Sequence, residues 1–194
     1  MPKILLALFL HFVLILAGVM VIDTDVTAGK KMEIERLIDN SNHHASFALV
    51  EELKRQGVIE IDKPTALERF HARMNQNGSY TWNGVGAYMP GPKSITKTNV
   101  FVGWKYIDFQ QWHNTYDLTM TMNGALIQET NFTDMGPGSI LRASLIVNGT
   151  TYELPPKVMT GPCLVAVAYV DDPGISPRVG RQLIPVISVQ ELRF

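Results

Sequence analysis

The run Ile4-Leu-Leu-Ala-Leu-Phe-Leu-His-Phe-Val-Leu-Ile-Leu-Ala-Gly-Val-Met-Val-Ile22 decides how the rest of this chain is interpreted. It carries no charged residue and matches the roughly 20 residues that a helix needs to cross the hydrocarbon core of a bilayer. Without a proline, it passes into the charged, periodic segment Lys30 to Gln56. The two parts together predict one helical rod from Ile4 to Gly57, roughly 75–80 Å long at about 1.5 Å per residue.

The beginning of the chain has features of both a secretory signal and a membrane anchor. Lys3 and the α-amino group give a short positive region ahead of the apolar run, as in a signal peptide. The run is too long for a usual signal core, however, and the nearest small-x-small site, 17–19, is followed by apolar residues through Ile22. We therefore predict that residues 1–22 are an uncleaved transmembrane anchor, with a cleaved signal as the alternative.

Charges on the two sides of the run bear on its orientation. Lys30, Lys31 and Arg36 follow the run, which under the positive-inside rule opposes export of the remaining chain. Long domains are translocated largely regardless of such counts. We expect the C-terminal part to lie outside the cell, anchored in the membrane and placed on the cell surface or in surface filaments.

Residues 23–57 have the pattern of an amphipathic stem. Apolar residues recur at helical spacing and leave one stripe for packing, while charged residues cover much of the remaining surface. Gly57 follows Lys54-Arg55-Gln56, which is typical of a helix C-terminus. The stripe consists of Ile34, Leu37, Ile38, Ala45, Ala48, Leu49 and Leu53.

Residues 58–78 are predicted to be a short helical connector. Asp62 has the position of an N-cap, and Pro64 lies in the first helical turn. We expect a helix over roughly Thr65 to Asn75 that folds back as a hinge between the stem and the body.

Residues 79–194 are rich in aromatic and β-branched side chains, Gly and Asn, and they predict a β-rich globular domain. Asn123-Gly124 and Asn148-Gly149 separate extended segments and predict two hairpins, 118–129 and 141–154. The continuous apolar run 164–170 predicts a strand covered on both faces. Within the segment 99–109, Gly103 is interpreted as a bulge, and Pro185 indicates an edge strand in 182–194. The fold class is therefore α+β, with an antiparallel β-sheet or sandwich after the long helix.

Composition excludes some classes of partner and bond. The formal net charge is −1, so no strong basic field attracts nucleic acid, and we expect no nucleic-acid partner. Cys163 is the single cysteine, so no disulfide forms within the chain. Its place before an apolar run predicts a buried thiol in a strand.

No catalytic or metal-binding pattern emerges from the chain. Adjacent His43 and His44 would point about 100° apart on a helix, and Asp171-Asp172 lacks an alternating set of calcium ligands. The sequence contains no nucleophile elbow, phosphate-binding loop or zinc-protease motif. We expect no enzyme activity, no metal, no cofactor and no small-molecule substrate.

Three tryptophans are the candidate ligand contacts of the β-rich domain. Trp82, Trp104 and Trp112, with nearby tyrosines, have the composition of a stacking platform for sugars or bases. Packing in the core and across strands is the competing interpretation of the same residues.

An apolar helix that continues into an amphipathic one and then a β-rich body resembles type IV pilins and pseudopilins. The segment Asp25-Val-Thr-Ala-Gly-Lys-Lys-Met-Glu-Ile-Glu-Arg-Leu-Ile-Asp-Asn-Ser-Asn-His-His-Ala-Ser-Phe-Ala48 is similar to the stretch after the membrane span in TadE/TadG-like proteins of tight-adherence pili. Those proteins have an Asp after the span and then a Leu-Gln-Asn-Ala-Ala-Asp-Ala-Ala-like run. Asp25, Leu37, Asn42, Ala45 and Ala48 occupy comparable places, over about the first quarter of the chain.

Two features depart from that pattern. No Gly followed by a hydrophobic residue, with a Glu at the fifth position, marks a prepilin-peptidase site. Ser41-Asn-His-His44 replaces the alanine-rich patch. The resemblance therefore leaves open both processing and a role as the major filament subunit.

The resemblance implies a structural or assembly subunit of a cell-surface filament or secretion apparatus. Its apolar helix would be held by the membrane before assembly and by other pilin-like subunits afterwards. Two hypotheses from other classes compete with this one: an anchored binding module for a glycan, surface polymer or DNA, and an enzyme with a scattered site. The residues implied for assembly are Leu5, Leu8, Phe12, Ile15, Val19, Ile34, Leu37, Ile38 and Ala45.

Overall fold

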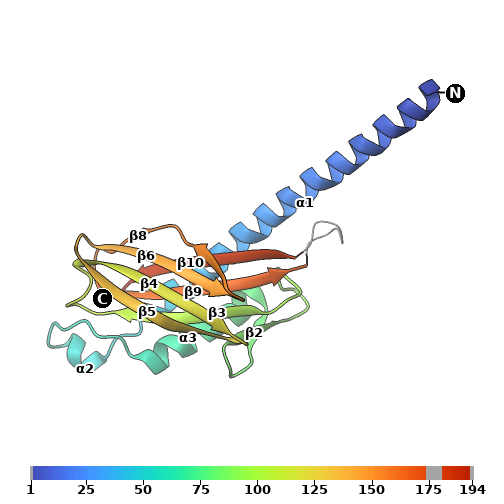
Figure 1. Cartoon of the computed structure of the whole chain (residues 1–194). Coiled ribbons are helices and arrows are strands. Elements are labelled where there is room, and N and C mark those ends of the chain that lie inside the picture. Colours follow the sequence, from blue (N-terminus) through green and yellow to red (C-terminus); the bar gives the residue numbers. More distant parts are fainter. Residues whose placement is uncertain (1, 174–180, 193–194) are drawn as a thin grey trace.

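A computed structural model describes residues 2–173 and 181–192, so the predicted last strand is described only as far as Leu192. Within these ranges, a long N-terminal helix precedes two β-sheets, which confirms the α+β class. Helix α1 (Pro2–Ala45) leaves the body as a straight rod, with the N-terminus far from the sheets (Figure 1).

The predicted rod is too long, because α1 ends at Ala45 and not at Gly57. The chain then bends, and Leu49 forms an isolated antiparallel bridge with Ile61. Between these two residues lies only the single turn α2 (Glu51–Lys54). Ala48 and Leu49 are buried at 1% and 7% exposure in this bent path. A continued helix would bury the same stripe, so periodicity alone does not locate the end of α1.

Gly57 closes α2, although it does not close the long helix. Its φ is +78°, a conformation that favours glycine. The amide of Gly57 donates to the carbonyl of Lys54 at 3.0 Å, and the amide of Val58 donates to the carbonyl of Leu53 at 2.9 Å. This pair of bonds is the Schellman pattern that satisfies the last carbonyls of a helix.

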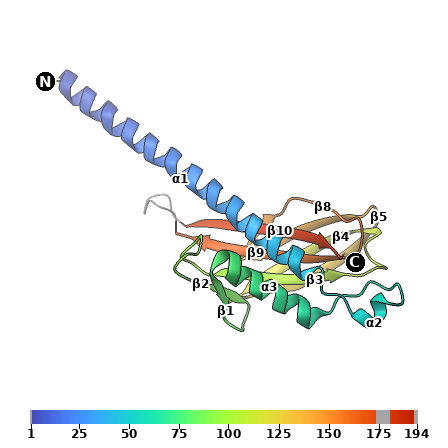
Figure 2. The ribbon, with the colours of Figure 1, turned by 180° about the vertical axis from the view of Figure 1, so that it is seen from behind.

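Helix α3 (Lys63–Gly78) begins where the sequence predicts it. The Asp62 carboxylate accepts hydrogen bonds from the backbone amide and hydroxyl of Thr65, at 3.2 and 2.7 Å. The sequence predicts this helix as a hinge between the stem and the body, whereas α3 packs beside the last turns of α1 as part of the body (Figure 2). Its buried residues Ala66, Phe70 and Met74 belong to the main core.

The first sheet has the strand order β1-β2-β3-β9-β10, with all neighbours antiparallel. Strand β9 is almost entirely buried, as the apolar run 164–170 predicts, and Cys163 at its start is fully buried. Pro185 lies in the edge strand β10, also as predicted. The bounds are β1 (Tyr80–Trp82), β2 (Ala87–Pro90), β3 (Val100–Ile107), β9 (Cys163–Asp172) and β10 (Gln182–Glu191).

The second sheet has the order β5-β4-β6-β7, and β8 pairs with the start of β6. Both predicted hairpins are present. Asn148 and Gly149 form the β6–β7 turn with φ of +50° and +79°, whereas the β4–β5 turn lies one residue later, at Gly124-Ala125. The bounds are β4 (Asn114–Asn123), β5 (Leu126–Pro137), β6 (Ile140–Val147), β7 (Thr150–Glu153) and β8 (Lys157–Val158).

The expectation of a purely antiparallel domain is wrong, because β4 and β6 pair in parallel. Strands β5 and β6 lie on opposite sides of β4, so the link between them passes across the first end of β4. There the amides of Gly138 and Ser139 donate to the carbonyl of His113 at 3.1 and 3.3 Å. Both residues have positive φ, +154° and +52°, as this tight crossing requires.

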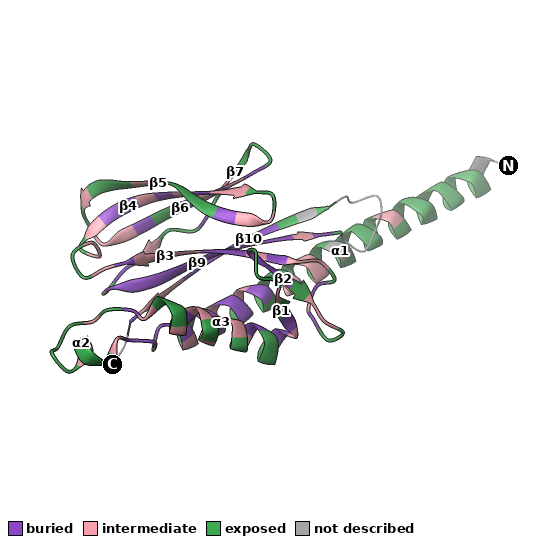
Figure 3. Cartoon of the chain, turned by 90° about the horizontal axis from the view of Figure 1, so that it is seen from below, coloured by how far each residue is buried: buried purple, intermediate pink, exposed green. Residues whose placement is uncertain are grey.

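The body has three layers: helices, first sheet and second sheet (Figure 3). One core lies between the helices and the first sheet, and a second core lies between the two sheets. Alternate residues of β9 serve the two cores, as Ala166 and Val167 illustrate. Gly103 pairs in register with Val167, so the predicted bulge is absent at this position. A Cβ on Gly103 would lie 2.7 Å from Cγ2 of Ile127, which shows that the glycine permits close packing of the sheets.

Candidate functional sites

The first half of α1 is a continuous apolar surface. The segment is long and apolar enough to cross a membrane, and none of its most apolar window is buried in the chain. A membrane anchor and a signal sequence both have this character. Covering one such large side chain contributes roughly 1.5–3 kcal/mol, so the run requires lipid or protein around it. The five assembly residues predicted within this run are exposed: Leu5 73%, Leu8 68%, Phe12 55%, Ile15 61% and Val19 44%.

The stem residues predicted for assembly are buried in the body instead of exposed. Ile34 and Ile38 are fully buried, Leu37 is 4% exposed and Ala45 is fully buried, all in the core against α3 and the first sheet. The expectation that this stripe stays free for neighbouring subunits must be corrected, since the chain's own body already covers it. A charge at the fully buried Ala45 would therefore disrupt the body itself.

Asn42 is the polar centre of the contact between α1 and the first sheet. Its side-chain Nδ2 donates to the carbonyl of Leu164 at 2.9 Å, and it lies 3.1 Å from the hydroxyl and 3.3 Å from the carbonyl of Ser188. Asn42 and Ser188 are both fully buried. Sequence analysis did not assign Asn42 this role, although an asparagine within an apolar stripe is a signal for a buried hydrogen-bonded group.

A second polar contact marks the point where α1 leaves the body. Lys30 pairs with Asp172 at the end of β9, with side-chain exposures of 24% and 3%. The described residues between the apolar run and the first buried stem position, Ile34, are helical throughout. At about 1.5 Å per residue, the eight positions from Ile22 to Lys30 place the end of the apolar run about 12 Å along the helix from this contact.

The three predicted tryptophan contacts do not form one platform. Trp82 and Trp104 lie on the helix side of the first sheet, with ring centres 5.9 Å apart. Trp112 packs against the other core, between the sheets, and its ring centre lies 3.7 Å from that of His113. Core packing, the competing interpretation, therefore accounts for much of the aromatic content.

His71 joins the cluster around Trp82. Its ring stacks on Trp82 at 4.7 Å, and its Nδ1 lies 2.6 Å from the hydroxyl of the buried Tyr88. Burial lowers the pKa of His71 and raises the pKa of Tyr88, so both groups favour their neutral forms. With the histidine proton on Nε2, the phenol donates to Nδ1. Sequence analysis missed this pair, because the two residues come from separate elements, α3 and β2.

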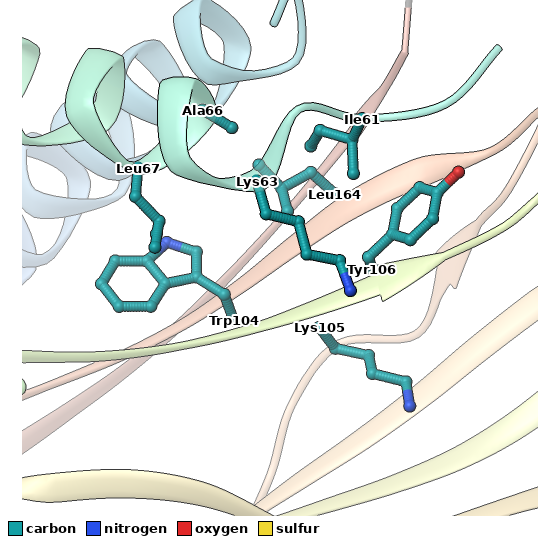
Figure 4. A pocket seen from close by; sticks show the side chains of 8 residues that line it. All are labelled: Ile61, Lys63, Ala66, Leu67, Trp104, Lys105, Tyr106 and Leu164. Atoms are coloured by element: carbon teal, nitrogen blue, oxygen red, sulfur yellow. The ribbon is translucent and has the colours of Figure 1, made fainter. Parts of the chain in front are cut away.

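A cavity of about 420 Å³ opens between the start of α3 and strand β3 (Figure 4). Trp104 and Tyr106 form one wall from alternate positions of β3, and Leu67 faces them from α3. Burial, followed by the charges of Asp108 and Glu60, raises the pKa of Tyr106 to about 12. The lining residues are Ile61, Lys63, Ala66, Leu67, Trp104, Lys105, Tyr106 and Leu164.

Within residues 2–173 and 181–192, no three His, Cys, Asp or Glu side chains are placed to hold one metal ion. Comparisons with protein-family models, with curated proteins and with solved structures give no significant match to this chain.

Proposed function

We propose that this chain is a membrane-anchored, pilin-like structural or assembly subunit of a cell-surface filament or secretion apparatus. The observation that carries the proposal is the division of α1 into two parts. Up to Ile22 the helix exposes apolar side chains, whereas from Ile34 it is a core element of the body. Such a helix joins an apolar assembly segment rigidly to a polar head.

In this proposal the bilayer holds the apolar run before assembly. Neighbouring apolar helices replace the lipid afterwards, through close packing of their side chains. The head lies outside the cell as a sandwich of the two sheets covered by α3, and its loops face outward. The assembly surface is then restricted to the exposed residues of the run, such as Leu8 and Phe12.

The chain is well suited to a cross-linking test, since its natural thiol is protected. Cys163 is fully buried, and burial raises its pKa to about 12. Leu8→Cys and Phe12→Cys, made separately in the full chain, place a single reactive thiol on the run. Thr150→Cys on the exposed turn side of β7 provides the matched control.

Membranes from expressing cells are oxidised, and the products are separated without reductant. At least one helix variant should form disulfide-linked dimers in high yield, and the protein should resist extraction by alkaline carbonate. Electron microscopy of the native cells should show filaments that an antibody against the head decorates. A monomeric product secreted into the medium, with its N-terminus beyond Ile22, would refute the proposal.

A further inference from the structure

The cavity between α3 and β3 is outside the surfaces that the proposed assembly uses. Its volume of about 420 Å³ lies within the range of small-molecule sites, roughly 300–1,000 Å³. Most of the wall is apolar, from Ile61, Ala66, Leu67 and Leu164. The flat side of the cavity comes from the rings of Trp104 and Tyr106. This shape and chemistry suit a flat apolar group.

Polar atoms at the cavity are few and are mostly donors. The indole Nε1 of Trp104 is buried and has no hydrogen-bond partner among the described residues. Figure 4 shows this nitrogen on the edge of the indole that faces Leu67 and Lys63. An N–H group in this position requires an acceptor, and an indole nitrogen cannot itself accept a hydrogen bond.

Of the two lysines that line the cavity, one forms an ion pair and the other does not. Lys105 points away from α3, where its Nζ lies 2.9 Å from a carboxylate oxygen of Glu129. Lys63 is exposed, lies 6.0 Å from the ring centre of Tyr106 and forms no ion pair within the described ranges. The mouth of the cavity therefore presents one ammonium group that forms no ion pair, with Asp108 and Glu60 close enough to Tyr106 to raise the pKa of its hydroxyl.

We infer that this cavity binds a small aromatic carboxylate, with its ring between Leu67 and the Trp104–Tyr106 wall and its carboxylate toward Lys63. The indole N–H of Trp104 donates to the same ligand. A sugar fits less well, because its hydroxyls require hydrogen-bond partners around the whole ring, and the wall here is largely apolar.

The test uses the full chain in lipid nanodiscs, with ¹⁵N-labelled tryptophan and 2-naphthylacetate as the probe. Each of the three indole N–H resonances is assigned by its loss in Trp82→Phe, Trp104→Phe or Trp112→Phe. The Trp104 resonance should shift and saturate as the probe is added, whereas Trp112, in the other core, should not move. The neutral analogue 2-naphthylethanol should bind more weakly.

Lys63→Gln is the decisive variant, since its exposed site tolerates the change, and Lys93→Gln is the control at another exposed lysine. Lys63→Gln should weaken binding by about fivefold, and Lys93→Gln should leave it unchanged. Equal shifts of all three indoles would indicate partition of the probe into lipid and overturn the inference. An unmoved Trp104 resonance, or unchanged affinity in Lys63→Gln, would also overturn it. None of these outcomes depends on filament assembly.

Discussion

The ammonium nitrogen of Lys30 lies 2.6 Å from a carboxylate oxygen of Asp172, where α1 leaves the body. The two residues are 142 positions apart, so the pair joins the helix to a strand that is distant in the sequence. Asp172 is almost completely buried, and a buried carboxylate is costly without a partner. The pair therefore stabilises the contact between the helix and the body, and it holds the direction of the helix at this point.

The structure predicts where the chain can be shortened. A chain of residues 24–194 lacks the apolar run but keeps every stem residue in the core, so it should be soluble, folded and cooperative in thermal unfolding. A chain of residues 78–194 lacks the stem and α3, and therefore exposes the core that includes Ile34, Ile38 and Phe70. It should aggregate or lack a thermal transition. Circular dichroism and gel filtration distinguish the two outcomes, and a well-folded 78–194 would contradict this account of the core.

Lys30→Gln should destabilise the 24–194 chain by about 1–3 kcal/mol, because the buried carboxylate of Asp172 would lose its ion-pair partner. Lys31→Gln is the matched control, since Lys31 pairs with Glu35 at 3.9 Å on an exposed surface. Its effect should stay below about 0.5 kcal/mol. Urea unfolding measures both changes in the free energy of unfolding. Similar losses of unfolding free energy in the two variants would show that the buried pair stabilises the protein no more than the exposed pair does.

Gly103→Ala should cost about 1–3 kcal/mol through overpacking. The new methyl group would lie 2.7 Å from a side-chain carbon of Ile127 and 2.8 Å from its backbone oxygen, so the two sheets would have to separate. Gly161→Ala serves as the control, because no neighbouring atom lies within 4 Å of the added carbon. Urea unfolding of both variants tests the contact, and equal stability would mean that the sheets adjust without strain.

Stability should fall as the pH drops below about 6.5, because burial lowers the pKa of His71 from the ordinary value of 6.5. The unfolded chain then binds a proton that the folded chain takes up only at lower pH, which favours unfolding. His71→Phe should reduce this slope between about pH 7.5 and about pH 5. Part of the slope should remain in this variant, because the pKa of His44 is also lowered. Burial is the main cause of that shift, followed by the charges of Arg73 and Arg69. Urea midpoints at the two pH values measure the slope. An unchanged slope in the variant would exclude His71 as its source.

Local signals in the sequence were sufficient for much of the β domain. Asn148-Gly149 has the positive φ values that its turn requires, and the apolar run 164–170 lies in a strand buried on both faces. The N-cap Asp62 is likewise a local feature, with its partner Thr65 three residues away. These predictions succeeded because each depends on neighbouring residues only.

Features that depend on residues distant in the sequence could not be predicted from local patterns. The end of α1 at Ala45 depends on the Leu49–Ile61 bridge, and the stripe in the sequence continues past it unchanged. The parallel pairing of β4 with β6 has no local signature. The aromatic composition is evident in the sequence, but its division between Trp104 at the cavity and Trp112 in the other core follows from the order of strands.

The hydrogen bonds of Asn42 also have a consequence for the order of folding steps during synthesis. Its two partners, Leu164 and Ser188, follow it by 122 and 146 residues, so the ribosome makes them long after the stem. A growing chain therefore holds the stem without its sheet until these residues have been made. Contacts of such long range form late and slowly. Under the proposed membrane anchoring, insertion of the apolar run therefore precedes folding of the head.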